Sequence, residues 1–273
     1  MFVSDKLIYL HLQKTGGTHV TSVLSRYIAC EQEKQPMHGS LPQGYVANSK
    51  YVVGSVRNPW DWYVSLWAYG CGKRGSFTNK LTAKKYGRYL SRLGSSPACA
   101  LRGIWSECSK PVRQWDRLYQ DGRDAGLFRE WLSLLFSQER KYDIGPEYAC
   151  SKLSTYAGAM TYRYMGIYTA GRSDGMVERI TGADDLAAYD RKNNVLNDVI
   201  RTESLHDDLI RVIGAAGYQL DQEQIEEIRN AGRTKTSDRH SAGKYYDNRT
   251  LDLVLEKERF LIEKYAYQPP DIC

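Results

Sequence analysis

Two segments decide the fold of this chain: Leu10-His-Leu-Gln-Lys-Thr-Gly-Gly-Thr18 and Val53-Gly-Ser-Val-Arg-Asn-Pro-Trp-Asp-Trp-Tyr-Val-Ser65. The first continues an apolar run that begins at Leu7, and the second continues one that begins at Tyr51. Each pattern predicts a buried strand of a parallel sheet that passes through a turn into a helix. α/β proteins hold phosphates at such junctions, because the first N–H groups of the helix point at the anion.

The rest of the pattern extends this α/β expectation. Asn58 is a good N-cap, Pro59 fits the first helical position, and Asp61 sits where the helix dipole favours a carboxylate. We predict strands over Leu7–Leu12, Tyr51–Val56 and Asp198–Arg201. Helices are predicted over Thr18–Ala29, Pro59–Tyr69, Leu127–Gln138, Asp207–Ala216, Glu223–Asn230 and Asn248–Tyr265. Without repeats or a low-complexity linker, residues 1–273 are expected to form one domain, with a variable region at about 71–165.

The turn of the first segment has the residue types that bind an anion. Gly16 and Gly17 let main-chain N–H groups approach closely, Thr15 and Thr18 add hydroxyl groups, and Lys14 adds a charge. The order differs from a Walker P-loop, in which the lysine follows the glycines. Taken alone, a Gly-Gly turn between a strand and a helix is often merely structural.

The second segment favours the phosphate interpretation. Arg57 ends a predicted strand and Ser65 follows two helical turns later, so a guanidinium and a hydroxyl can grip a second phosphate. The alternative is that Arg57 caps the sheet and Ser65 is a small residue at a helix contact. Both segments lie at a junction between a strand and a helix, and they occur in this order along the chain. The purely structural interpretation of Arg57 and Ser65 is therefore the weaker one.

Together the two segments resemble the nucleotide-binding motifs of sulfotransferases, which move a sulfuryl group from 3'-phosphoadenosine 5'-phosphosulfate (PAPS) to an acceptor. The resemblance implies a P-loop-like three-layer α/β fold with a central, mainly parallel sheet and a variable helical or loop insertion for the acceptor. It implies that residues 14 to 18 hold the 5'-phosphosulfate, and that Arg57 and Ser65 hold the 3'-phosphate. It extends to Ile200–Leu209, which resembles the family's later strand and helix, and to Tyr245–Tyr267, which resembles its C-terminal helix.

The family usually has a basic loop that closes over the nucleotide. The matching segment here suggests phosphate contacts from Arg233, Lys235, Ser237 and Arg239. A solvated basic loop remains an equal alternative for each of these residues.

Sulfuryl transfer needs a cation on the leaving oxygen and a base for the incoming group. Lys14 suits the first task without a metal ion. His38 lies where some glycan sulfotransferases of the family carry their catalytic histidine, so the resemblance implies that it is the base; Glu31 and Glu33 are the alternatives. An ordinary loop histidine is the other interpretation of His38. His11 and His19 are expected to pack within the sheet and the first helix.

The bulk composition sets the class of protein. The formal charge is 38 − 32 = +6 and 42% of the residues are hydrophobic, as in a folded protein that handles anionic ligands. The six cysteines form no CxxC pair, so reduced, mostly structural thiols are expected. No apolar stretch is long enough to span a membrane and no basic-then-apolar leader is present, which predicts a cytoplasmic protein.

The acceptor is less defined. From Trp62 to Ser106 there is no Asp or Glu, whereas Lys73, Arg74, Lys80, Lys84, Lys85, Arg88, Arg92 and Arg102 fall there. This stretch can attract an anionic acceptor such as an acidic saccharide, or it can be a solvated face. A saccharide or another small molecule is therefore expected, with a hydroxyl or an amine as the sulfated group.

Three other functions compete with this one. A P-loop-like nucleoside or small-molecule kinase needs a lysine after the glycines and an acidic magnesium ligand on a neighbouring strand, and neither is evident. A non-catalytic nucleotide- or glycan-binding module would be favoured if Lys14 or Arg57 were missing, and both are present. A nucleic-acid binder should show a recognised nucleic-acid-binding motif, and none is found.

Overall fold

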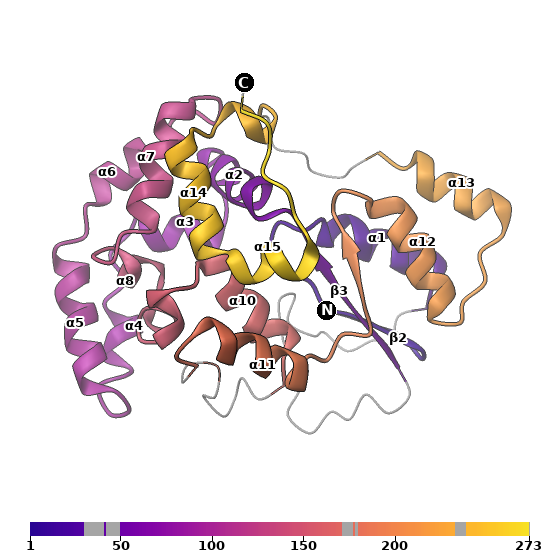
Figure 1. The fold of residues 1–273 in the computed structure, drawn as a ribbon, viewed down its shortest axis with the longest axis horizontal. Coiled ribbons are helices and arrows are strands. Elements are labelled where there is room, and N and C mark those ends of the chain that lie inside the picture. Colours follow the sequence, from indigo (N-terminus) through magenta and orange to yellow (C-terminus); the bar gives the residue numbers. More distant parts are fainter. Residues whose placement is uncertain (30–40, 42–49, 171–176, 178–179, 233–238, 273) are drawn as a thin grey trace. The chain divides into compact units, whose positions relative to one another are not determined.

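The computed structural model describes residues 1–29, 41, 50–170, 177, 180–232 and 239–272. The chain divides into two compact units (Figure 1). Unit 1 consists of Met1–Asn58, Arg163–Met176 and Ala187–Thr236, and unit 2 of Pro59–Tyr162, Val177–Leu186 and Ser237–Cys273. The predicted single domain stays a prediction.

Unit 1 contains a four-stranded mixed sheet in the order β1-β2-β3-β4. The strands are β1 (Phe2–Val3), β2 (Leu7–Tyr9), β3 (Tyr51–Val56) and β4 (Asp198–Arg201). β2, β3 and β4 are parallel, with Tyr9 opposite Val53 and Val53 opposite Asp198, whereas β1 is an antiparallel edge strand. The α/β class is thus confirmed, and the predicted bounds of β3 and β4 are those observed.

Three helices pack on one face of this sheet: α1 (Gly17–Tyr27), α12 (Leu205–Ala215) and α13 (Gln222–Asn230). The predicted helices are confirmed with ends shifted by one or two residues. Alternate residues of the strands point to the helices, because side chains of a strand alternate between faces. The shared core contains Leu7, Tyr9, Val53, Ile200, Val20, Leu24, Leu209, Val212, Ile213 and Ile228.

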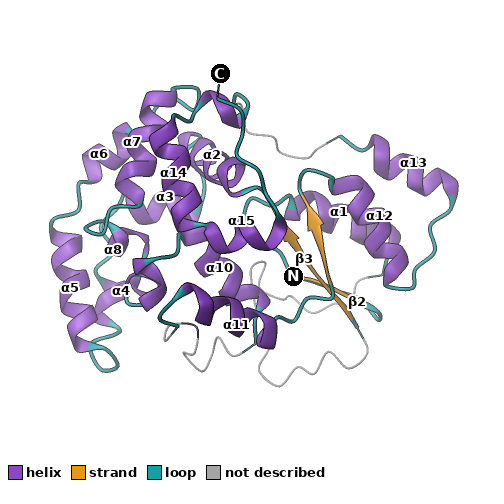
Figure 2. Ribbon diagram, in the orientation of Figure 1, coloured by secondary structure: helices purple, strands orange, loops and turns teal. Residues whose placement is uncertain are grey.

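In unit 2 the described residues form helices and loops without a strand (Figure 2). The helices before residue 140 are α2 (Pro59–Cys71), α3 (Ser76–Leu81), α4 (Gly87–Leu90), α5 (Pro97–Cys108), α6 (Val112–Arg117) and α7 (Ala125–Leu135). They are followed by α8 (Lys141–Ile144), α9 (Pro146–Ala149), a 3-10 helix (Lys152–Thr155), α10 (Ala159–Tyr168), α11 (Ala183–Asn193) and a 3-10 helix (Ala242–Lys244). α10 and α11 continue into unit 1. Most of these helices were not predicted. Those of three to six residues have too few turns to show a period.

The predicted last helix, Asn248–Tyr265, is wrong in one respect. Two helices occupy it, α14 (Asn248–Lys257) and α15 (Arg259–Tyr265), and they meet at Glu258. The buried carboxylate of Glu258 accepts hydrogen bonds from Met160 N (3.1 Å) and Thr161 N (2.8 Å), in the first turn of α10. Glu258 therefore satisfies helix-end N–H groups from a distant part of the chain, which no local pattern reveals.

The expectation of reduced thiols is also wrong for one pair. Cys99 and Cys150 form a disulfide, with 5.9 Å between their Cα atoms and a sequence separation of 51. Among the described cysteines, Cys71 and Cys108 are free. Disulfides are typical of oxidising compartments, so this pair does not support the cytoplasmic expectation, which stays a prediction. Within the described part of the chain, every helix is too short or too polar to cross a bilayer.

Candidate functional site

The first predicted phosphate-binding segment forms the loop between β2 and α1. Lys14 (φ 66°) and Gly16 (φ 78°) both have left-handed backbone conformations. Such residues turn successive main-chain N–H groups toward one side, as in anion-binding loops. α1 begins at Gly17, and its first N–H groups have no acceptor within the helix. The loop therefore combines main-chain donors with the positive end of an 11-residue helix.

Both glycines of this loop are required by their surroundings. A Cβ atom at Gly16 would lie 2.6 Å from Cδ1 of Leu205, and its positive φ disfavours any other residue. A Cβ atom at Gly17 would collide with the ring of His11. The loop is thus closely packed between α12 and the segment that follows β2.

A buried hydrogen-bond network ties the loop to β3. The hydroxyl of Tyr168 accepts from the N–H groups of Leu12 (2.9 Å) and Ser55 (3.0 Å), and it donates to the carbonyl oxygen of Ser55 (2.7 Å). Burial raises the pKa of Tyr168 to about 12, so the hydroxyl keeps its proton. Thr15 Oγ1 donates to the carbonyl oxygen of Leu12 (2.6 Å) and lies 2.6 Å from Ser55 Oγ. The Thr15 hydroxyl is therefore engaged within the protein, and its residue is fully buried.

Arg57 joins the two predicted segments. Its Nη1 donates to the carbonyl oxygen of Lys14 at 2.9 Å, and the residue is 8% exposed. The N–H of the next residue, Asn58, donates to Oε1 of Glu203 (2.7 Å), just after β4. The ends of β2, β3 and β4 thus meet at one edge of the sheet, with Lys14 and Arg57 on the same side. Lys14 is half-buried and Thr18 is exposed.

The other predicted contacts lie in unit 2 or outside the described residues. Ser65 is on α2 and is buried. Arg239 forms an ion pair with Asp61 in the first turn of α2, with 2.7 Å between Nη2 and Oδ1. The following predicted residues lie outside the described residues: Glu31, Glu33, His38, Arg233, Lys235 and Ser237.

The structure adds neighbours of the loop that the sequence did not indicate. Tyr168 follows a stretch with no recognisable motif, so nothing in the sequence links it to Leu12. His19, in the first turn of α1, and His206, in the first turn of α12, have ring centroids 5.3 Å apart. The Gln13 side chain accepts a hydrogen bond from Arg163. These pairs are 150 or more residues apart, and only the folded chain brings them together.

Metal binding and relatives complete the description of the site. Within the described ranges, no three His, Cys, Asp or Glu side chains are grouped so that they could hold a metal ion. No protein-family model, no curated protein and no solved structure matches the chain.

Proposed function

We propose that this protein is a PAPS-dependent sulfotransferase with a P-loop-like three-layer fold. The observation that carries the proposal is the 2.9 Å hydrogen bond from Arg57 to the carbonyl oxygen of Lys14, because it joins the two residues that bear the cations of the motifs at one edge of the sheet. A nucleotide with phosphates at its 5' and 3' positions needs two cationic phosphate sites at a short separation. The left-handed loop, the start of α1 and the two cations supply that combination.

Lys14, Gly16, Gly17 and Thr18 are the proposed contacts of the 5'-phosphosulfate. Thr15 contributes its main-chain N–H, because its hydroxyl is engaged by Leu12 and Ser55. Arg57 and Ser65 are the proposed contacts of the 3'-phosphate. Arg239 joins them only if its ion pair with Asp61 exchanges for the phosphate; Arg233, Lys235 and Ser237 remain proposed contacts of the same loop.

The reaction is an in-line displacement at sulfur. An acceptor oxygen or nitrogen forms a bond to the sulfur as the bond to the bridging oxygen breaks, and adenosine 3',5'-bisphosphate leaves. The ammonium of Lys14 stabilises the charge that grows on the leaving oxygen. His38 takes the acceptor proton, with Glu31 and Glu33 as alternative bases. The acceptor is a saccharide or another small molecule.

Phosphoryl transfer is the second candidate, and one contact favours it. Glu203 lies two residues after β4, and its carboxylate is held at the same edge of the sheet by Asn58 N. An acidic residue after the neighbouring strand is what a magnesium-dependent kinase needs. The order of Lys14 and the glycines still favours sulfuryl transfer.

Titration calorimetry distinguishes the two candidates. We expect the protein to bind adenosine 3',5'-bisphosphate without metal, and Lys14→Ala to weaken binding and abolish sulfate transfer from labelled PAPS. Lys192→Ala removes an exposed lysine on α11 and is the matched control. Binding of ATP with Mg²⁺ but not of the bisphosphate would replace the proposal by the kinase alternative.

The base is tested separately from the donor site. His38→Ala is expected to lower kcat for sulfate transfer while the Kd for adenosine 3',5'-bisphosphate stays unchanged. Unchanged turnover would remove His38 as the base, and Glu31→Gln and Glu33→Gln would be measured next. A loss of bisphosphate affinity in His38→Ala would instead make His38 a donor-binding residue.

A further inference from the structure

Large apolar side chains are exposed along one stretch of the sequence of unit 2. Seven large hydrophobic residues are exposed in the described part of the chain, and five of them lie between residues 86 and 105. We name these five the 86–105 surface: Tyr86, Leu90, Leu93, Leu101 and Trp105. Their exposed fractions run from 36% for Tyr86 to 76% for Trp105. Concentrated exposed apolar residues mark interaction sites, whereas single ones do not.

Trp105 is the most unusual member of the 86–105 surface. The other five tryptophans, Trp60, Trp62, Trp67, Trp115 and Trp131, are each at most 1% exposed. Because most of its indole ring is in water, Trp105 contributes much less buried apolar area to the core than each of the other five tryptophans. Tryptophan is favoured at the boundary between water and lipid, because its ring is apolar and its N–H is polar.

The charged residues within this stretch of sequence have one sign. No carboxylate occurs from Trp62 to Ser106. Lys85 and Arg102 are exposed, and within the described residues no ion pair holds either side chain. Other cations of the stretch have partners: Lys84 donates to the carbonyl oxygen of Cys108 and Arg92 pairs with Glu147. Lys85 and Arg102 therefore remain available for an external anion.

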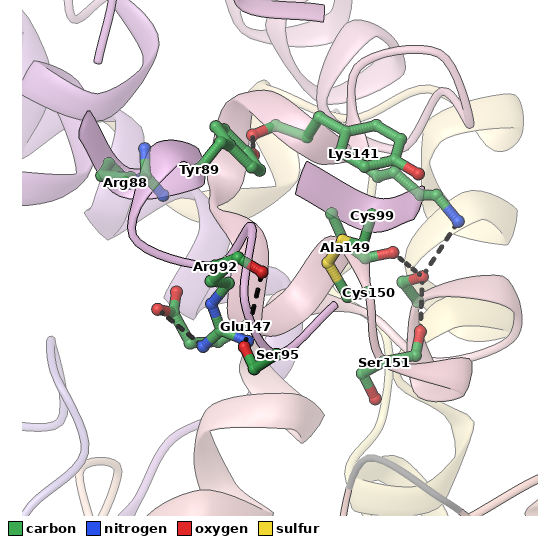
Figure 3. Close-up of a disulfide and its surroundings, with 12 residues drawn as sticks. Arg88, Tyr89, Arg92, Ser95, Cys99, Lys141, Glu147, Ala149, Cys150 and Ser151 are labelled. Carbon is green, nitrogen blue, oxygen red and sulfur yellow. Dashed lines mark hydrogen bonds and ion pairs between the residues drawn. A yellow bond between two sulfur atoms is a disulfide. The ribbon is translucent and has the colours of Figure 1, made fainter. Parts of the chain in front are cut away.

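The elements beneath the surface are firmly held. α5 exposes Leu101 and Trp105, which are four residues apart on one helix face, and buries Gly103 against the ring of Tyr89. The disulfide from Cys99 ties the first turn of α5 to Cys150, just after α9 (Figure 3). The buried ion pair between Lys110 and Glu107 (2.6 Å) holds the other end of α5. Leu101 and Trp105 are thus presented by a helix that is held at both ends.

We propose that the 86–105 surface binds the surface of an anionic membrane. Aliphatic and aromatic side chains enter the headgroup region while Lys85 and Arg102 contact anionic lipid, the combination typical of interfacial helices. A soluble saccharide would explain Trp105 and the cations, but not the three exposed leucines. The proposal is independent of the donor site in unit 1.

Vesicle binding with tryptophan fluorescence tests this directly. We expect the full-length protein to co-sediment with vesicles of phosphatidylcholine and phosphatidylserine, and much less with phosphatidylcholine alone. Because Trp105 is the one exposed tryptophan, acrylamide should quench mainly its emission in the free protein. On binding, that emission should shift to the blue and lose its access to acrylamide.

Two variants with matched controls separate the apolar and ionic contributions. Lys85→Gln/Arg102→Gln should weaken binding to the anionic vesicles about thirtyfold. Each cation near the membrane contributes about 1 kcal/mol, and the variant removes two. Arg191→Gln/Lys192→Gln removes an exposed pair in unit 1 and should change nothing. Leu101→Ala/Trp105→Ala should weaken binding by at least tenfold, whereas Leu255→Ala, an exposed leucine on α14, should not.

Three outcomes would overturn the proposal. The first is equal or absent binding to both kinds of vesicle. The second is binding that survives both the ionic and the apolar variant. The third is a concentration-dependent dimer, or a complex with a soluble acidic glycan, that protects Trp105 while vesicles do not, which would assign the surface to that partner. Circular dichroism of each variant confirms that the loss is not unfolding.

Discussion

The guanidinium of Arg57 donates a hydrogen bond to the main-chain carbonyl oxygen of Lys14 at 2.9 Å. Their residue numbers differ by 43, yet Arg57 directly follows β3 and Lys14 lies in the loop that follows the neighbouring strand β2. Arg57 therefore holds the loop in place, and in the proposed function it has a second task, which is to contact the 3'-phosphate. An arginine can do both, since its guanidinium is a planar fork of five donors.

Arg57→Ala is expected to weaken binding of adenosine 3',5'-bisphosphate by roughly ten- to a hundredfold. Hydrogen bonds to charged groups contribute about 1.5 to 3 kcal/mol. Arg57→Lys keeps the charge but loses the fork, so it should recover only part of the affinity. Calorimetry measures all three proteins, and equal affinities of Arg57→Ala and the wild type would remove Arg57 from the site.

Gly16→Ala should lower the free energy of unfolding by about 2 kcal/mol or more, because a methyl group both strains the left-handed backbone and meets Leu205. Gly214→Ala is the matched control: Gly214 lies in the exposed part of α12 with open space around its Cα. Alanine there should stabilise the protein by about 0.5 to 1 kcal/mol. Urea unfolding of both variants checks the contrast.

Tyr168→Phe should cost about 2 to 4 kcal/mol, because it leaves the buried N–H groups of Leu12 and Ser55 without their acceptor. Tyr189→Phe removes a hydroxyl that donates to Ala170 at the surface, and should cost about 1 kcal/mol or less. If both variants unfold at the same urea concentration, the Tyr168 network does not hold the loop.

Stability should fall as pH rises from about 4.5 to about 7, because of Glu258. Burial raises the pKa of Glu258 from its ordinary 4.5 to about 7, and the hydrogen bonds from Thr161 and Tyr63 offset this only in part. The folded state therefore holds the proton more tightly than the unfolded chain. The contribution is fully present below pH 4.5 and is lost above pH 7, a difference of about 3 kcal/mol.

Glu258→Gln should flatten this part of the pH profile in urea unfolding experiments. Glu256→Gln, which changes an exposed carboxylate two residues earlier on α14, is the control and should leave the slope intact. Wild-type and Glu258→Gln profiles that run parallel between pH 4.5 and 7 would contradict a raised pKa at Glu258.

Cysteine labelling should follow burial and pairing. Among the cysteines that the structure describes, Cys108 is exposed and should react with iodoacetamide before Cys71. Cys71 should react slowly, because burial raises its pKa to about 12 and leaves little thiolate. Cys99 and Cys150 should be labelled only after reduction. Peptide mass spectrometry measures each site, and labelling of Cys99 before reduction would contradict the disulfide.

The sequence by itself determined much of unit 1. The apolar runs predicted β3 and β4 with their observed ends, and Gly16 predicted the turn before α1. These signals are local, since a strand buried on both faces needs continuous apolar residues and a left-handed turn needs glycine. The sequence also predicted that the ends of β2 and β3 lie close together. This follows because neighbouring parallel strands end at the same edge of the sheet.

Tertiary structure decided the remainder. The partner of Cys99, the acceptor that Glu258 provides for α10, and the Tyr168 network each join residues about 50 to 160 positions apart. No periodicity or motif encodes such pairs, because their energy depends on burial and on distances fixed only when the chain is folded. The exposed 86–105 surface belongs to the same class: apolar residues in sequence indicate a core, and only the fold shows which of them it leaves in water.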